Sequence, residues 1–258
     1  MASILFEIKN SVAIITLNRP EKFNSFNREM ALLLQQKLDD CANDKNVRVI
    51  YLTGNGKAFC AGQDLGELTG ENPPGFEVIL AEHYNPIVTK IRTIEKPVIC
   101  AVNGVAAGAG ANIALCCDVV VASSSASFIQ AFSKIGLIPD SGGTFTLPRL
   151  IGFQKASALM MLGDRVSATE AERMGMIYKV FDDEIFANES MKIAITLSQM
   201  ATKGLAYTKL ALNASLDNSL AAQLQTEDEL QYKAAHTTDY KEGVTAFIEK
   251  RMPQFKGE

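Results

Sequence analysis

The stretch that decides the fold is Pro97-Val-Ile-Cys-Ala-Val102, followed directly by Asn103-Gly-Val-Ala-Ala-Gly-Ala-Gly-Ala111. A wholly apolar run followed by a glycine-rich turn predicts a buried strand, a tight turn and then a helix. A second apolar run, Asp118-Val-Val-Val-Ala122, leads towards another punctuated turn, Gly136-Leu-Ile-Pro-Asp-Ser-Gly-Gly143. Runs that are apolar on both faces indicate sheets covered on each side. The stretch therefore predicts an α/β core.

The two turns also carry the first functional signal. Backbone N–H groups at the start of a helix stabilise negative charge, and the first turn is expected to present such groups. The only acid in the second turn is Asp140. Donors facing a carboxylate are what proton transfer beside a stabilised oxyanion requires. A plain turn role for Asp140 stays open, because Pro-Asp-Ser-Gly also favours turns.

The rest of the chain predicts one continuous architecture. Residues 4–8 and 12–17 favour a hairpin, and residues 27–41 have helical spacing with Asn27 as a cap. Residues 76–94 predict one long helix, preceded by a polar surface loop at 71–75. Strand-strand-helix units recur up to about residue 182, and the remainder is helical. We predict a core over residues 1–195 and a helical region over residues 196–258.

Composition narrows the class of protein. The chain has 258 residues, 47% hydrophobic and 21% charged, with a net charge of −4, which argues against a nucleic-acid surface. Its five cysteines are odd in number and form no Cys-x-x-Cys pair, which indicates free thiols in a reducing compartment. No apolar run approaches the length of a membrane span, no basic leader is present, and no metal-ligand spacing occurs. We expect a cytoplasmic protein without a membrane, metal or nucleic-acid partner.

Three segments together resemble the crotonase superfamily of acyl-CoA enzymes, which includes enoyl-CoA hydratases and isomerases. They are Leu17-Asn-Arg-Pro-Glu-Lys22, Phe59-Cys-Ala-Gly-Gln-Asp-Leu65 and Ala101-Val-Asn-Gly-Val-Ala-Ala-Gly-Ala-Gly110, the last followed by Cys117-Asp118. The resemblance covers essentially the whole chain. It implies a crotonase-like spiral of ββα units with a C-terminal helical trimerisation region. It also implies a homotrimer or a hexamer. A hetero-complex with a paralogous hydratase is a further expected assembly.

The resemblance also assigns residues. It implies an oxyanion hole made by the backbone N–H groups of Gln63 and Ala109. It implies an acyl-CoA substrate and no separate cofactor, because coenzyme A is part of the substrate. Phe247 and Lys250 would reach the ligand of a neighbouring subunit, although Lys22 and Lys250 could also be ordinary solvated charges. The residues expected to bind coenzyme A or the acyl group are Lys22, Phe23, Ser25, Ala61, Asp64, Leu65, Phe132, Phe247 and Lys250.

The positions of the acidic catalytic residues distinguish hydratases from isomerases in this family. The two glutamates of the hydratases fall on Asn112 and Phe132, which cannot transfer protons, and an acid appears instead at Asp140. One partly buried carboxylate, with its pKa raised, suits the isomerisation of a double bond. Within the family, the chain most resembles isomerases of ring-epoxidised phenylacetyl-CoA, which also convert 3-enoyl-CoA. The alternatives are an enoyl-CoA hydratase and a non-catalytic acyl-CoA- or RNA-binding member.

Overall fold

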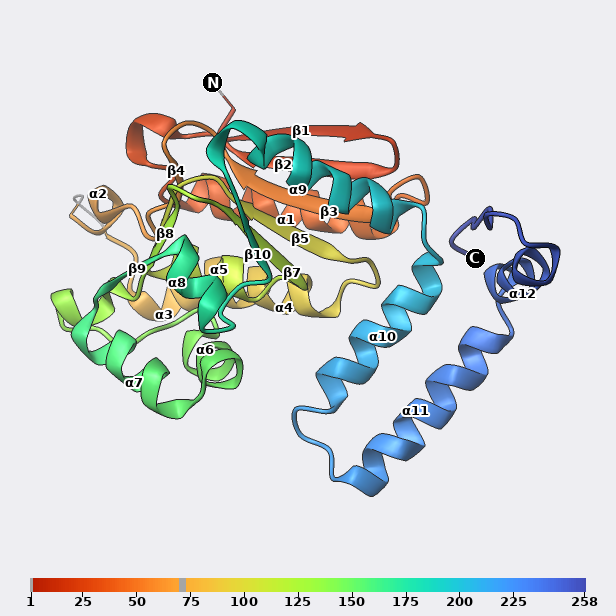
Figure 1. The fold of residues 1–258 in the computed structure, drawn as a ribbon. Coiled ribbons are helices and arrows are strands. Elements are labelled where there is room, and N and C mark those ends of the chain that lie inside the picture. Colours follow the sequence, from red (N-terminus) through yellow and green to blue (C-terminus); the bar gives the residue numbers. More distant parts are fainter. Residues whose placement is uncertain (1, 70–72) are drawn as a thin grey trace.

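The computed structural model describes residues 2–69 and 73–258 and shows an α/β core with a helical C-terminal region (Figure 1). The core holds two sheets. The six-stranded sheet has the order β1 (Ile4–Lys9), β2 (Val12–Leu17), β3 (Val49–Gly54), β5 (Val98–Val102), β7 (Val119–Ser123) and β10 (Lys179–Phe181). The four-stranded sheet has the order β4 (Ala58–Cys60), β6 (Val105–Ala107), β8 (Ser127–Ile129) and β9 (Arg165–Ser167). The predicted fold class is confirmed.

The chain alternates between the two sheets. β3 is followed by β4, β5 by β6, and β7 by β8, so each pair gives one strand to each sheet before a helix follows. From β2 to β10 all pairings in the large sheet are parallel, whereas β1 and β2 form the predicted antiparallel hairpin. All five residues of β5 are buried, as expected for a strand covered on both faces.

Helices cover both faces of the large sheet. On one face, Phe186 and Ala194 of α9 (Asp183–Ser198) pack against apolar residues of β2, β3, β5 and β7. On the other face lies the main core, to which α1 (Arg28–Asn43) contributes Leu34 and Leu38. The predicted cap of α1 is confirmed, because the Asn27 side chain accepts a hydrogen bond from the backbone N–H of Met30. The remaining core helices are α2 (Leu65–Leu68), α3 (Phe76–Val78), α4 (Asn85–Thr93), α5 (Ala109–Leu115), α6 (Gly143–Ile151), α7 (Phe153–Leu162) and α8 (Ala168–Arg173).

Several local expectations need correction. The helix predicted over 76–94 is interrupted by a π-helix at Ile79–Tyr84, which lies between α3 and α4. The segment 103–111, expected to be a turn, contains the three-residue strand β6, and the three-residue strand β4 was not predicted. Such strands are created by pairing with distant neighbours, so local propensity does not reveal them. A 3₁₀-helix at Ala131–Ile135 was also not predicted. Of the loop predicted at 71–75, residues 71 and 72 lie outside the described residues.

The C-terminal helices project from the core as an extended arm (Figure 1). α10 (Thr202–Ala214) and α11 (Leu220–Ala235) pack together and α12 (Thr238–Glu249) follows. The chain end returns to the base of α10, where Arg48 donates hydrogen bonds to Thr202 Oγ1 and to the carbonyl of Phe255, each at 2.9 Å. The predicted boundary at residue 195 falls within α9. None of the described helices is long and apolar enough to cross a bilayer.

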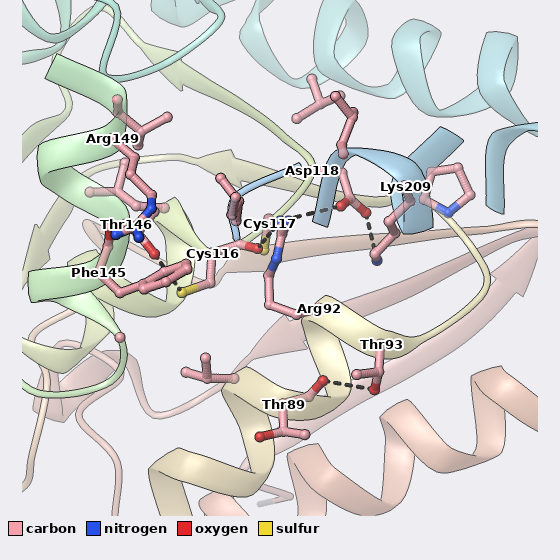
Figure 2. Close-up of a pocket in the computed structure, with 18 of the residues that line it drawn as sticks. Thr89, Arg92, Thr93, Cys116, Cys117, Asp118, Phe145, Thr146, Arg149 and Lys209 are labelled. Atoms are coloured by element: carbon pink, nitrogen blue, oxygen red, sulfur yellow. Dashed lines mark hydrogen bonds and ion pairs between the residues drawn. The ribbon is translucent and has the colours of Figure 1, made fainter. Parts of the chain in front are cut away.

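An ion pair between a buried lysine and a partly buried aspartate attaches α10 to the core. Lys209 Nζ lies 2.8 Å from Asp118 Oδ2 and also donates to the carbonyls of Ile91 and Lys96, at 2.7 and 3.3 Å. Asp118 accepts a further hydrogen bond from the N–H of Val98 at 2.8 Å, so it ties α10 to the start of β5. Figure 2 shows Lys209 and Asp118 pointing toward each other at one end of a groove.

We predict that Asp118→Ala destabilises the protein by about 3 kcal/mol, because removal of one partner leaves a buried ammonium group without its counter-charge. Urea unfolding at fixed protein concentration measures the change in the free energy of unfolding. The matched control is Glu95→Ala, which removes the exposed pair between Lys203 and Glu95 and should cost less than about 1 kcal/mol. Equal losses in the two variants would contradict an anchoring role for Asp118.

Candidate active site

Three parallel strands end at one edge of the four-stranded sheet, and the candidate site lies at that edge. β4 pairs with β6, and β6 pairs with β8, all in parallel. The carboxyl ends of parallel neighbours meet at the same edge of a sheet, where ligands of open α/β sheets usually bind. Gln63 follows β4, Ala109 follows β6, and Phe132 follows β8. The topology therefore brings together three residues that the sequence selected separately.

The turns after β4 and β6 are in close contact at Gly62, which packs against the backbone of Ala107 and Ala109. A methyl group placed on Gly62 would lie 3.0 Å from the carbonyl oxygen of Ala107 and 3.4 Å from the backbone nitrogen of Ala109. The φ angle of Gly62 is +90°, and Gly108 has φ +54° and ψ −130°, a conformation open essentially to glycine alone. The absence of side chains at these positions lets the two backbone segments approach closely.

Two backbone N–H groups remain available in these turns. Ala109 is the first residue of α5, so its N–H has no partner within the helix. The N–H of Gln63 lies between two ladder bonds, Phe26 N–H to the Gly62 carbonyl and Asp64 N–H to the Phe26 carbonyl. Among the residues that the structure describes, neither the Gln63 nor the Ala109 N–H has an acceptor.

The side chain of Gln63 is held at both ends. The hydroxyl of Tyr84 donates to Gln63 Oε1 at 2.8 Å, and Gln63 Nε2 donates to Glu67 Oε2 at 2.8 Å. Tyr84 is the last residue of the π-helix, so that irregular turn delivers its hydroxyl to the segment after β4. Burial, followed by the nearby Cys60, Asp140 and Glu67, raises the pKa of Tyr84 well above 10, which keeps the hydroxyl a neutral donor.

Asp140 is partly buried in the turn before α6. Burial raises the pKa of its carboxyl group, as the sequence predicted, and a hydrogen bond from the Ser141 hydroxyl to Oδ1 at 2.8 Å opposes that rise. The charge of Asp140 in turn raises the pKa of Tyr84, which is bonded to Gln63. Asp140 is therefore electrostatically coupled to the group that holds the Gln63 turn.

The two positions aligned with the hydratase acids are both buried. Asn112 donates from Nδ2 to the carbonyl of Asp140 at 2.8 Å. The tip of the Phe132 ring would lie 3.8 Å from a methyl group placed on Gly108. An amide and an aromatic ring thus stand beside Ala109 and Asp140.

The segment expected to bind coenzyme A is assembled from the turn after β2 and the residues after β4. Arg19 bonds the carboxylate of Asp64 at 2.8 Å and the carbonyl of Ser25 at 2.6 Å. Burial alone would raise the pKa of Asp64, but hydrogen bonds from Arg19 and from the N–H of Gly66, with the charges of Arg19 and Lys22, hold it below its usual value. Arg19 therefore links Ser25 to Asp64, and the charge of Lys22 acts on the same carboxylate.

Apolar surface is exposed along the same segment. The N–H of Ala61 donates to the carbonyl of Phe23 at 3.0 Å, and Ala61, Phe23 and Leu65 are all exposed. An exposed apolar strip beside a lysine fits a ligand with an apolar chain and an anionic end.

The structure does not bring Phe247 and Lys250 to this site within one chain. Phe247 is 85% exposed on α12, and Lys250 is the exposed residue that ends that helix. In Figure 1, α12 lies at the opposite end of the molecule from α2, which begins at Leu65. Their predicted contribution to the ligand of another subunit stays a prediction.

A large groove lies next to the candidate site without containing it. It has a volume of about 730 Å³ and runs between α4, α6 and α10 (Figure 2). Gly142 and Thr146 line it behind the Asp140 turn, and Arg149 lies over the ring of Phe145 at 3.7 Å. Gln63, Ala109 and Asp140 are not among its lining residues. Among the described residues, no cluster of three or more His, Cys, Asp or Glu side chains could hold a metal ion.

Sequence reasoning missed the residues that hold the site together. Tyr84, Glu67 and Arg19 form hydrogen bonds with site residues that lie between four and 45 positions away in the sequence. The one local signal was the serine beside Asp140, because Ser and Asp side chains often bond within turns. Ser141 lies in the left-handed region, with φ +51°, and is buried.

The crotonase fold is a spiral of strand-strand-helix units that form two sheets. In this fold, two backbone N–H groups without a partner lie where two glycine-containing turns meet. The enoyl-CoA hydratase/isomerase family model matches residues 7–258, and the chain belongs to that family. It is 46% identical to 1,2-epoxyphenylacetyl-CoA isomerase of Escherichia coli (strain K12), covering 100% of this chain and 99% of the relative. It is 43% identical to a probable enoyl-CoA hydratase of Rhodobacter capsulatus, covering 99% and 98%. A crystal structure of enoyl-CoA hydratase from Bacillus anthracis superposes with a TM-score of 0.92 at 35% identity, covering 99% and 100%.

We predict that Ser141→Ala raises the pKa of Asp140 further, because it removes the hydrogen bond that stabilises the carboxylate. Carbon-13 NMR titration of the aspartate carboxyl groups, assigned with Asp140→Asn, measures the change. The control is Ser133→Ala, an exposed serine of the preceding 3₁₀-helix. A titration of Asp140 that is unchanged or moves to lower pH in Ser141→Ala would contradict the prediction.

Proposed function

We propose that the protein is an acyl-CoA isomerase in which Asp140 acts as acid and base. The observation that carries the proposal is a partly buried carboxylate, Asp140, whose backbone is hydrogen-bonded to the helix that begins at Ala109. Its charge also acts on Tyr84, which donates a hydrogen bond to Gln63. The thioester oxygen would accept hydrogen bonds from the two N–H groups. Loss of one such donor costs about 3 to 4 kcal/mol of transition-state stabilisation in comparable sites.

The proposed reaction moves one proton. For a 3-enoyl-CoA substrate, the Asp140 carboxylate removes a proton from C2, and the electron pair moves into an enolate whose oxygen lies at Gln63 and Ala109. The protonated Asp140 then returns the proton to C4, and the double bond stands between C2 and C3. The raised pKa makes the Asp140 carboxylate a stronger base for the first step and moves the pKa towards neutral pH, where one group can both accept and return a proton.

We further propose that the preferred substrate is a ring-epoxidised phenylacetyl-CoA, converted to its ring-expanded oxepin isomer, with 3-enoyl-CoA as a second substrate. The support is the 46% identity to the Escherichia coli relative, whose name states 1,2-epoxyphenylacetyl-CoA isomerase. The ring of Phe132 beside Gly108 offers an apolar wall for an aryl group. Coenzyme A would lie along Lys22, Phe23, Ser25, Ala61, Asp64 and Leu65, and the reaction uses no other cofactor.

Hydration of 2-enoyl-CoA is the second candidate, because several relatives are described as hydratases. That reaction needs a group that activates water and a group that protonates carbon. The Asn112 amide is committed to the Asp140 carbonyl, and Phe132 has no polar atom in its side chain. The two residues favour isomerisation over hydration.

We propose that the protein acts in the cytoplasm as a homotrimer or as a hexamer of two trimers, and that a paralogous hydratase is a further partner. Large apolar side chains stand exposed along the C-terminal arm: Leu212, Leu220, Leu224, Tyr232, Phe247, Ile248 and Met252. Exposed apolar surface of this extent is typical of protein interfaces. The five cysteines are free and buried, which suits a reducing compartment.

We predict that Asp140→Asn lowers the turnover number for 3-hexenoyl-CoA by about 100-fold or more, because the amide cannot transfer the proton. The affinity for coenzyme A, measured by calorimetry, should change little. Asp164→Asn, at an exposed aspartate, is the control and should keep wild-type turnover. Isomerisation by Asp140→Asn at the wild-type rate would overturn the proposed mechanism.

Parallel assays of the epoxide, 3-hexenoyl-CoA and crotonyl-CoA separate the candidate functions. Faster turnover of the epoxide than of 3-hexenoyl-CoA supports the preferred substrate. Hydration of crotonyl-CoA as fast as either isomerisation would favour a hydratase. Coenzyme A binding without turnover of any of the three would favour a non-catalytic acyl-CoA-binding protein.

We predict that Phe247→Asp shifts the protein to lighter species, because a charge replaces an apolar side chain at the proposed interface. Sedimentation velocity should give the wild type a mass of three or six times the 28.0 kDa of one chain. The control is Leu5→Asp, at an exposed leucine of β1 outside the arm. An unchanged assembly in Phe247→Asp would place the interface elsewhere.

A further inference from the structure

Asn112 is a buried amide with both ends engaged. Its side chain has no exposed surface, its Nδ2 lies 2.8 Å from the carbonyl oxygen of Asp140, and its Oδ1 accepts a hydrogen bond from Gln130 Nε2 at 2.8 Å. Because the Asp140 carbonyl oxygen can only accept a hydrogen bond, the Asn112 amide is oriented with its NH₂ group towards Asp140 and its Oδ1 towards Gln130. Three segments that end near the same site, α5, the residue after β8 and the turn before α6, are thereby joined.

The turn that Asn112 contacts needs outside support. The Asp140 carbonyl also accepts a hydrogen bond from the N–H of Gly143 at 2.8 Å, and the two central residues, Ser141 and Gly142, have φ angles of +51° and +74°. This is a type I′ turn, in which a non-glycine residue at the first central position is strained. Strained backbone persists where its surroundings over-determine it, and Asn112 supplies one such contact.

Asn112 also fits closely against the other side of the turn. A methyl group placed on Gly143 would lie 2.3 Å from Asn112 Nδ2, so the first residue of α6 has to be glycine for the two helices to approach this closely. On α5, Asn112 stands one turn after Ala109, whose N–H is one of the two open donors. One short helix therefore carries both a donor of the candidate site and the side chain that holds the candidate acid.

We propose that Asn112 is a positioning residue that holds the backbone of Asp140 at a defined place relative to the Gln63 and Ala109 N–H groups. The inference rests on the proposed function, since it gives Asn112 a role in a reaction carried by Asp140. The hydrogen bond reaches the Asp140 carbonyl and leaves the carboxylate free to meet substrate. Gln130 acts one step further away, because its Nε2 donates to Asn112 Oδ1 and so helps to hold the Asn112 side chain against the turn.

An amide suits this position better than a carboxylate. A carboxylate at 112 would set an oxygen against the Asp140 carbonyl oxygen and would place a second negative charge near Asp140. Gln130 Oε1 is buried without a hydrogen-bond partner among the described residues, so the pair is retained although one polar atom stays unsatisfied. Asn112 therefore has a role of its own, beyond the loss of the acid that hydratases have at this position.

The test compares Asn112→Asp and Asn112→Ala with the wild type on 3-hexenoyl-CoA. Asn112→Asp keeps the size of the side chain and removes the donor, so loss of positioning should lower kcat by about 10- to 100-fold with KM and coenzyme A affinity nearly unchanged. The kcat of Asn112→Ala should be lowered by a similar factor. Thermal unfolding and coenzyme A calorimetry establish that each variant is folded.

A matched control separates positioning from general damage. Asn103 makes a similar amide-to-carbonyl bond, at 2.9 Å to Gly56, but does not contact the Asp140 turn. Asn103→Asp should therefore keep wild-type kcat. Gln130→Leu should lower kcat by a smaller factor than Asn112→Asp, and it tests the proposal if the Asn112 variants do not fold.

The decisive readout is the double variant with Asp140→Asn. If Asn112 acts through Asp140, Asn112→Asp has little further effect on the residual rate of Asp140→Asn, and the two losses are not additive. Additive losses, or wild-type kcat in Asn112→Asp, would overturn the positioning role. Wild-type activity of Asp140→Asn would instead overturn the proposed function itself, so the two failures are distinguishable.

Discussion

The parallel pairing of β4, β6 and β8 is the constraint on which the candidate site depends. These are strands of only three residues, but their shared direction places the segments that follow them at one edge of the sheet. Gly62 and Gly108 then allow the first two segments to touch, so the N–H groups of Gln63 and Ala109 open in one place. A side chain at either glycine would demand a different backbone path, and the donors would separate.

The position of Asp140 follows from a second set of contacts. α5 begins at Ala109 and presents Asn112 to the Asp140 carbonyl, while the Ser141 hydroxyl meets the carboxylate. The backbone of the acid is thus tied to the same helix as one donor. Burial raises the pKa of Asp140, and the hydroxyl limits the rise, so the site combines a proton acceptor with an environment that disfavours its charge.

The sequence predicts the elements of this protein better than their contacts. Periodicity located α1 and its cap at Asn27, and the apolar run at 97–102 located β5, because each signal is contained in one continuous segment. β4 and β6 escaped detection because a three-residue strand is defined by its partner. The bond from Tyr84 to Gln63 depends on a π-helix that leaves no mark in apolar spacing. The raised pKa of Asp140 was expected from the local sequence, whereas the hydrogen bond from Asn112 to Asp140 could be seen only in the fold.

The chemistry of a double-bond shift explains why one acid can stand where hydratases use two. Hydration adds two groups, so one residue activates water while another supplies a proton. Isomerisation adds nothing, and the proton taken from one carbon is the proton returned to another. A single carboxylate that reaches both carbons is sufficient, provided that water is kept away from the enolate. The ring of Phe132 and the committed amide of Asn112 leave no group at those positions that could activate water. In the proposed mechanism, the proton-transfer group is Asp140, and Asn112, at a position where hydratases have an acid, instead supports the turn that carries Asp140.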